Sequence, residues 1–302
     1  MKSSTTYRRP VFRAVLSTTL VLLVAFTGAW AQSDATTQSF TASDGVEIHY
    51  LVEGRGDPVV LLHGITGTAA SNWGAAGIIG RLAEEFQVIA VDQRGHGKSG
   101  KPHDAASYGE RMALDVVDLL DHLRLQQAHV VGYSMGGFIT MKVVALAPDR
   151  LMSAVVGGAG WPSPELRDDA MFDALAESLE AGKGGGPLVE FLWPGGEPPT
   201  PEQVQAIGQA MVASNDQMAL AAVVRGMAGL DVDAELLRIN KVPTLNIIGS
   251  NDPLKPNADA LVDVMQEHRL HVIEGANHMN TLNSPEFVDT VRAFFIELCN
   301  CA

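Results

Sequence analysis

The pentapeptide Gly132-Tyr133-Ser134-Met135-Gly136 constrains this chain most. It follows an apolar run at 128–131 and opens a helical pattern over 134–147. A glycine-serine-glycine turn between a strand and a helix holds its serine in a strained, exposed position. Glycine at both ends leaves room for the chain to turn back, because a Cβ there would crowd the strand against the helix. The motif predicts an α/β fold with Ser134 as candidate nucleophile, provided that a base, an acid and oxyanion donors lie nearby.

Residues 1–31 have the composition of a signal peptide. Four cations precede an apolar run at 14–26, and Ala29-Trp30-Ala31 has the small-x-small form of a cleavage site. The apolar run is shorter than the ~20 residues that span a bilayer, which favours cleavage over a retained anchor. We expect cleavage near Ala31, export to the periplasm or the medium, and no stable membrane association afterwards.

The remaining chain is strongly acidic. The whole sequence has a formal charge of −14, and without the four leader cations 17 lysines and arginines face 35 carboxylates. Such a surface repels phosphate backbones and anionic headgroups, which argues against nucleic-acid binding. Cys299 and Cys301 are two apart, so a bridge between them would be strained and we expect no structural disulfide. Without a C-x-x-C or H-E-x-x-H motif, we also expect no metal site.

Apolar runs alternate with helical patterns along most of the chain. The predicted strands are 38–41, 46–52, 58–62, 86–91, 128–131, 151–156, 242–248 and 270–273, and the predicted helices are 78–85, 108–123, 134–147, 257–267 and 285–298. Asp44-Gly45 predicts a hairpin between the first two strands. Alternation of this kind indicates a mostly parallel sheet with helices on both faces.

Residues 161–230 break the alternation. They contain only helical stretches, at 170–179, 188–192, 202–213 and 218–227, separated by glycine- and proline-rich joints. We interpret this segment as a helical cap inserted between two strands of a core formed by residues 32–160 and 231–302. The alternative is a pair of additional crossover helices.

A base and an acid for Ser134 are predicted at strand ends. His278 stands in a short loop after the last predicted strand, and ligands of open parallel sheets lie at the carboxyl ends of the strands. The other histidines considered, His122, His129, His268 and His271, fall within predicted helices or strands. Asp252 follows the strand 242–248, whereas no carboxylate directly follows Val156. Asp252 would orient the imidazole of His278 and stabilise its cation.

Two backbone amides are the expected oxyanion donors. The N–H of Met135 follows the nucleophile at a helix N-terminus, whose dipole favours negative charge. The second donor would come from the loop after His63-Gly64, with Ile65 preferred over Thr66. His63 itself is expected to shape that loop through hydrogen bonds.

Five motifs in this order resemble the α/β-hydrolase fold superfamily. They are His63-Gly64, residues 92–99, the Ser134 pentapeptide, Asp252 and His278, and the resemblance covers 38–298. It implies an eight-stranded, mostly parallel sheet, and structural roles for Asp92, Arg94 and His96. It is closest to small esterases with a helical cap, enol-lactone hydrolases, carbon–carbon bond hydrolases and cofactor-free perhydrolases. Family members that attack with an aspartate, such as haloalkane dehalogenases and epoxide hydrolases, do not fit a serine at position 134.

The predicted function is cleavage of a carboxylic ester or lactone through an acyl-enzyme, with no cofactor. The cap is rich in large apolar side chains, which suit an apolar small-molecule substrate or simply bind the cap helices to the core: Trp161, Met171, Phe172, Phe191, Trp193, Met211, Met218 and Met227. Arg225 would pair with a substrate carboxylate or stay solvated. The alternatives are a carbon–carbon hydrolase or perhydrolase with the same triad, and a non-catalytic ligand-binding protein on this scaffold.

Overall fold

The computed structural model describes residues 1, 36–193 and 195–299. Apart from Met1, the predicted signal peptide lies outside these residues, as do its cleavage near Ala31, the first four residues predicted for the core, and Cys301. Among the helices of the described residues, none is both long and apolar enough to cross a bilayer.

The core is an eight-stranded sheet with the order β1-β2-β4-β3-β5-β6-β7-β8. Its strands are β1 (Thr36–Thr41), β2 (Glu47–Gly54), β3 (Pro58–Leu62), β4 (Gln87–Asp92), β5 (Ala128–Tyr133), β6 (Leu151–Gly157), β7 (Thr244–Gly249) and β8 (His268–Ile273). β2 pairs antiparallel with β1 and β4, and all other pairs are parallel. This confirms the predicted mostly parallel eight-stranded sheet.

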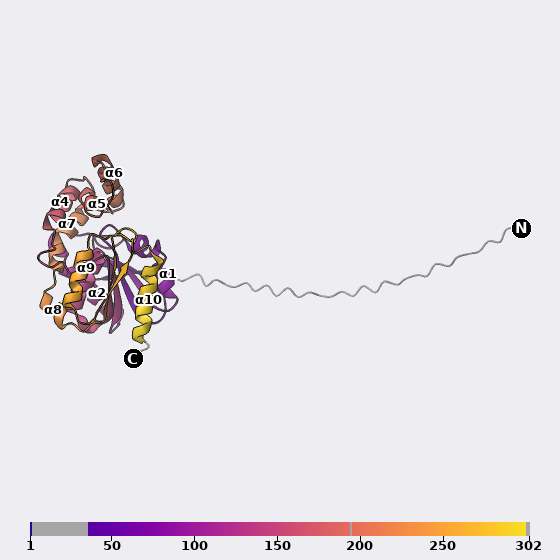
Figure 1. The fold of residues 1–302 in the computed structure, drawn as a ribbon. Coiled ribbons are helices and arrows are strands. Elements are labelled where there is room, and N and C mark those ends of the chain that lie inside the picture. The colour runs from indigo at the N-terminus through magenta and orange to yellow at the C-terminus, as the bar shows by residue number, and fades with distance from the viewer. Residues whose placement is uncertain (2–35, 194, 300–302) are drawn as a thin grey trace. The chain divides into compact units, whose positions relative to one another are not determined.

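Helices cover both faces of the sheet because its central strands are apolar on both sides. Val60 and Leu62 of β3 belong to one buried cluster, whereas Val59 and Leu61 belong to the other, as the two-residue period of a strand requires. The first cluster includes α2 (Glu110–His122), α3 (Met135–Leu146), α8 (Ala234–Ile239) and α9 (Lys255–Val264), and the second α1 (Ile78–Ala83) and α10 (Pro285–Cys299). Figure 1 shows these helices around the sheet.

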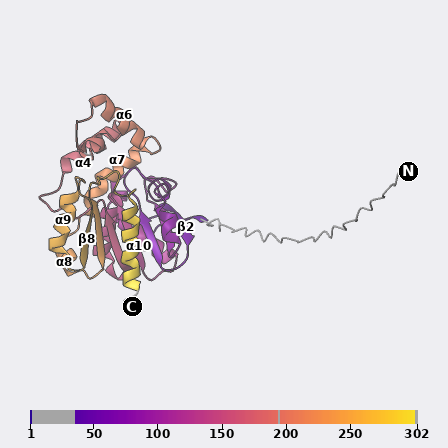
Figure 2. The same cartoon turned by 45° about the vertical axis from the view of Figure 1, so that its right-hand side comes forward.

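Residues 161–230 form four α-helices between β6 and β7. These are α4 (Asp169–Glu180), α5 (Gly186–Phe191), α6 (Pro201–Val212) and α7 (Gln217–Gly226). Asp168, Thr200 and Asp216 cap three of them through side-chain oxygens that accept backbone N–H groups. The helices share a small apolar core of their own that includes Leu175 and Leu220, and they lie at one end of the sheet (Figures 1 and 2).

Three local predictions differ from the structure. A π-helical turn at Ala69–Gly74 and the short helix α8 were not predicted, because six residues are too few to show a helical period. His268, predicted on a helix, is the first residue of β8, since α9 ends at Val264 and Met265 is already extended. The 3-10 turns are Ala105–Ser107, Pro148–Arg150 and Met227–Leu230.

Candidate active site

Ser134 stands at the turn from β5 into α3 with strained backbone angles. Its φ is 55° and its ψ −118°, a region that non-glycine residues rarely adopt. The Ser134 N–H donates to Gly157 O at 2.8 Å, which ties the turn to the neighbouring strand β6. The strained turn directs the hydroxyl away from the helix, into the space at the carboxyl edge of the sheet.

The two flanking glycines are required by close backbone contacts. A Cβ on Gly132 would lie 1.9 Å from Gly136 O, and one on Gly136 would lie 2.0 Å from Leu62 O. Neither contact can be relieved by rotating a side chain, because both partners are backbone atoms. The motif therefore brings β5, α3 and the end of β3 closer together than any larger residue permits.

The structure brings the predicted base and acid to Ser134. His278 Nε2 lies 3.0 Å from Ser134 Oγ, and His278 Nδ1 lies 2.9 Å from Asp252 Oδ2. Both side chains are almost fully buried, with 5% of His278 and 0% of Asp252 exposed. The second carboxylate oxygen of Asp252 accepts the Leu254 N–H at 2.9 Å, which holds the carboxylate in place. In this arrangement the imidazole can take the Ser134 proton, while the carboxylate orients the ring and stabilises its cation.

Tyr133 supports the histidine loop, a role that the sequence did not indicate. Its hydroxyl donates to His278 O at 2.5 Å, and the two rings lie 5.4 Å apart. Burial raises the pKa of Tyr133 far above its usual range, so the phenol remains a neutral donor. Tyr133 occupies the first position of the G-x-S-x-G motif at which any residue is allowed. Only the folded chain shows its contact with His278.

The two predicted oxyanion donors border the cavity beside Ser134. Ile65, Ser134 and Met135 line the same space, and Met135 is the first residue of α3. Within the described chain, neither amide N–H donates to a protein acceptor. Two unbound amides beside a nucleophile can stabilise an oxyanion, because they are oriented before charge develops. Thr66, the alternative donor, lines the second cavity at Ser134.

His63 sets the direction of the Ile65 N–H. The Gln93 N–H donates to His63 Nε2 at 3.0 Å, so Nδ1 carries the ring proton and donates to Gly64 O at 2.8 Å. Gly64 O and the Ile65 N–H belong to one trans peptide and point in opposite directions. Burial lowers the pKa of His63 to about 3, so the ring is neutral at neutral pH. His63 therefore orients the Ile65 amide that is the candidate oxyanion donor.

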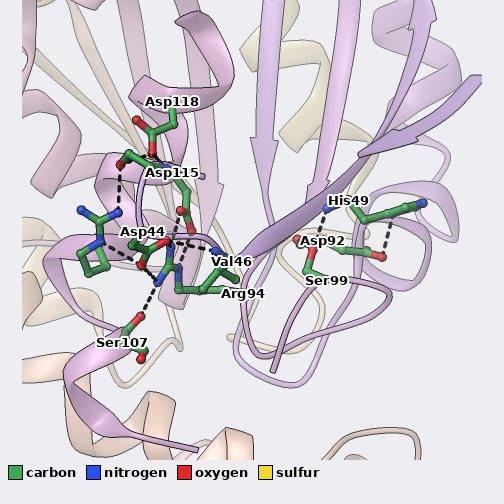
Figure 3. A network of polar contacts seen from close by, with 11 residues as sticks. Asp44, Val46, His49, Asp92, Arg94, Ser99, Ser107, Asp115 and Asp118 are labelled. Atoms are coloured by element: carbon green, nitrogen blue, oxygen red, sulfur yellow. Dashed lines mark hydrogen bonds and ion pairs between the residues drawn. The ribbon is translucent and has the colours of Figure 1, made fainter. Parts of the chain in front are cut away.

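A buried arginine anchors the turn after β4 (Figure 3). Arg94 is fully buried and binds both carboxylate oxygens of Asp115, at 2.7 and 2.6 Å. It also donates to Asp44 at 2.8 Å and to Ser107 O at 2.6 Å. The guanidinium holds the pKa of the Asp44 carboxyl well below its usual range. Two carboxylates and a carbonyl thus compensate a charge that burial alone would make costly.

The same turn reaches the oxyanion loop. The Asp92 carboxylate accepts the N–H groups of Ala69 and Lys98, at 2.9 and 3.0 Å. His96 Nε2 lies 2.5 Å from Ile65 O, next to the proposed donor. The hydrogen bonds given above connect Asp92, Arg94 and His96 to loops beside the site and not to Ser134.

Three adjoining cavities are lined by residues of the core and of 161–230, and two of them touch Ser134. An apolar cavity of about 40 Å³ touches Ser134 and adjoins an outer cavity of about 520 Å³, with which it shares Phe172 and Leu254. A second cavity at Ser134, of about 260 Å³, has a mixed lining with polar residues such as Ser71 and Asn72 and apolar ones such as Met211. Five of the eight large side chains singled out in the sequence line these cavities: Met171, Phe172, Phe191, Met211 and Met227.

The charges at the outer cavity are already paired. Its lining includes two arginines and three aspartates. Each arginine binds two carboxylates: Arg167 binds Asp169 and Asp231, and Arg225 binds Asp173 and Glu180. Arg225 is therefore engaged within 161–230 and offers no unpaired charge to a substrate carboxylate.

Buried neutral histidines predict acid sensitivity. Burial lowers the pKa of His129 to about 4, as it lowers that of His63 to about 3. In the unfolded chain both take up protons near pH 6.5, so between pH 6.5 and 4 the unfolded state binds more protons and stability falls as the pH falls. We expect each histidine to remove about 3 kcal/mol from the free energy of unfolding between pH 7 and 4.

Urea unfolding at several pH values between 7 and 4 would measure this loss. A chelator is present so that no metal ion affects the result. His129→Gln should flatten the pH dependence, whereas the exposed His122→Gln should leave it unchanged. If the free energy of unfolding of His129→Gln depended on pH as in the wild type, the lowered pKa of His129 would be contradicted.

Comparisons with known proteins match this architecture. Residues 57–184 match the family model described as the alpha/beta hydrolase fold. A non-heme haloperoxidase of Rhodococcus erythropolis is 30% identical over 275 residues, which cover 84% of this chain and 96% of that protein. The 3-oxoadipate enol-lactonase 2 of Acinetobacter baylyi is 28% identical over 256 residues, covering 82% of this chain and 92% of the lactonase.

A solved esterase shows the same fold. The esterase from Exiguobacterium antarcticum superposes with a TM-score of 0.69 at 23% identity, and the match covers 85% of this chain and 98% of the esterase.

Proposed function

This chain belongs to the α/β hydrolase fold family and is a hydrolase, and we propose that it cleaves neutral, apolar carboxylic esters or lactones through an acyl-enzyme on Ser134. The observation that carries the proposal is the hydrogen-bonded set of Ser134 Oγ, His278 and Asp252, with separations of 3.0 and 2.9 Å. A pure ligand-binding protein would need neither an ordered base nor a buried acid.

The mechanism is a two-step acyl transfer. His278 Nε2 accepts the Ser134 proton as Oγ attacks the substrate carbonyl, and Asp252 stabilises the resulting imidazolium. The amides of Met135 and Ile65 bind the tetrahedral oxyanion, and one such donor typically contributes roughly 100- to 1000-fold in rate. His278 then protonates the leaving alcohol, and water releases the acid by the same route.

The cavities support a neutral substrate with an apolar acyl group. The apolar cavity beside Ser134 is lined largely by aliphatic, aromatic and methionine side chains, which suit a hydrocarbon chain. The second cavity at Ser134, which has Ser71 and Asn72 in its mixed lining, suits the leaving alcohol. A substrate carboxylate would need an unpaired cation, yet both arginines of the outer cavity already bind two carboxylates each.

A substrate panel tests this proposal. The informative pair consists of two nitrophenyl esters that have the same acyl length and differ only in a terminal carboxylate. We expect the neutral ester to have the higher kcat/KM, with activity rising with chain length until the apolar cavity is full. A vinylogous diketone is included to detect carbon–carbon cleavage, and peracid formation from acetate and peroxide to detect perhydrolase activity. Turnover of the diketone alone, or a preference for the carboxylate ester, would contradict the proposal.

We further propose that the protein is exported, to the periplasm or the medium. The support is the composition of residues 1–31, with cations, an apolar run and Ala29-Trp30-Ala31 in the order of a cleavable signal. N-terminal sequencing of the exported protein should start near Gln32.

A further inference from the structure

A set of three metal-ligating side chains lies far from Ser134. Asp57 stands between β2 and β3, His129 is near the start of β5, and Cys299 is the last residue of α10. One ligand atom of each lies within 4.8 Å of those of the other two. We propose that Asp57, His129 and Cys299 bind a zinc ion.

His129 provides the second observation in favour of a ligand. Its ring is 1% exposed, and Nδ1 lies 2.7 Å from Ser153 Oγ. In the described part of the chain, Nε2 is buried without a hydrogen-bond partner. A buried nitrogen of this kind costs stability unless something binds it. Since Ser153 takes Nδ1, Nε2 is the nitrogen available to a metal.

The environment of His129 keeps the ring in a metal-binding form and orientation. The ring stacks on Phe295 at 4.2 Å and meets the edge of Phe86, so it cannot rotate freely. When Nδ1–H donates to Ser153 Oγ, the lone pair of Nε2 is free for the metal, an arrangement common among metal-bound histidines.

Asp57 and Cys299 supply the negative charge. Cys299 Sγ lies 3.5 Å from Asp57 Oδ2, as a thiol donating to a carboxylate. Among the described residues, Asp57 forms no ion pair with a lysine or arginine. Zinc would displace the thiol proton into solvent, so the thiolate and the carboxylate together balance the two charges of the ion.

Nitrogen, sulfur and oxygen ligands together favour zinc. Zn²⁺ accepts all three in tetrahedral sites, whereas Ca²⁺ and Mg²⁺ prefer oxygen alone. Asp57 and Cys299 are exposed, which gives the ion an entry path and leaves water for a fourth position. Five residue steps along β5, about 16 Å of extended chain, separate His129 from Ser134. A bound ion there would join the end of α10 to the β2–β3 turn and the sheet.

Cobalt titration tests the ligand set. The full-length protein, reduced and freed of metal with a chelator, is titrated with Co²⁺ alone. We expect one equivalent to bind, with a thiolate-to-cobalt charge-transfer band and the strong visible bands of a four-coordinate ion. Cys299→Ser should abolish the charge-transfer band, whereas Cys301→Ser should retain it. Absence of binding, or a band that persists in Cys299→Ser, would overturn the proposal.

Zinc binding tests the two buried residues. Ser153→Ala should weaken zinc binding by about 10- to 100-fold while keeping the cobalt band at saturation, because Ser153 only positions the ring. His129→Gln should weaken binding further, with the exposed His122→Gln as control. Zinc at a hundredfold above its Kd should raise Tm by roughly 5–10 °C in the wild type and not in Cys299→Ser. An equal rise in both proteins would show that zinc binds elsewhere.

Discussion

We expect Ser134→Ala to lower the kcat of ester hydrolysis by about 10⁶-fold, because the variant lacks the oxygen proposed to form the acyl-enzyme. The fold should survive, since alanine is smaller than serine and makes the same backbone turn at a φ of 55°. The assay is steady-state kinetics with the best neutral ester of the panel. Circular dichroism and urea unfolding should show a folded variant with nearly wild-type stability.

Covalent labelling provides the control for this variant. A fluorophosphonate should label the wild type once and leave Ser134→Ala unlabelled. Ser71→Ala is the matched control, because Ser71 lines the second cavity at Ser134, while its hydroxyl bonds to Thr68 and, among the described residues, to no histidine. Ser71→Ala should keep full labelling and lose less than tenfold in kcat. Labelling of Ser134→Ala would place the nucleophile at another residue.

Asp252→Asn should lower kcat by about 10⁴-fold while the protein stays folded. Asp252 Oδ2 accepts a hydrogen bond from His278 Nδ1, so Nε2 keeps its lone pair for the Ser134 proton. An asparagine amide can donate to Nδ1 instead and thus favours the tautomer with the proton on Nε2. That tautomer cannot act as a base for Ser134.

The matched control for Asp252 is Asp259→Asn. Asp259 is an exposed carboxylate on α9 that pairs with Lys255, and its replacement should leave kcat within about twofold, as expected of surface changes. The Asp252→Asn protein should bind the substrate with a near-normal KM, because Asp252 contacts His278 and not the cavity. A kcat within tenfold of the wild type would place the acid elsewhere in the chain.

The polar residues of the candidate site could be predicted because the sheet orders them. Ser134, Asp252 and His278 each follow a strand of the same parallel set, and the carboxyl ends of such strands meet at one edge. Each also stands in a glycine-, proline- or asparagine-rich turn that can be recognised locally. Position after a strand was therefore enough to select one histidine and one aspartate among many.

Other features depend on contacts between distant residues. Tyr133 binds His278 O across 145 positions, and no local pattern indicates this contact. The sequence predicted that His63 shapes a loop. Only the hydrogen bond that the Gln93 N–H donates to His63 Nε2 shows which ring nitrogen carries the proton. The expectation of no metal site rested on the absence of a short sequence motif. A motif search cannot find the proposed ligands Asp57, His129 and Cys299, because they are far apart in the sequence.

The sheet, the glycine-bounded turn at Ser134 and the chain order of Ser134, Asp252 and His278 could all be predicted from the sequence. These depend on periodicity and on glycine, which act over a few residues. Three features are visible only in the tertiary structure. They are the ion pairs of the two arginines at the outer cavity, the large side chains of 161–230 that line the cavity at Ser134, and the proximity of His129 to Asp57 and Cys299. Charge pairing and burial are set by neighbours in space, and these neighbours are far apart along the chain.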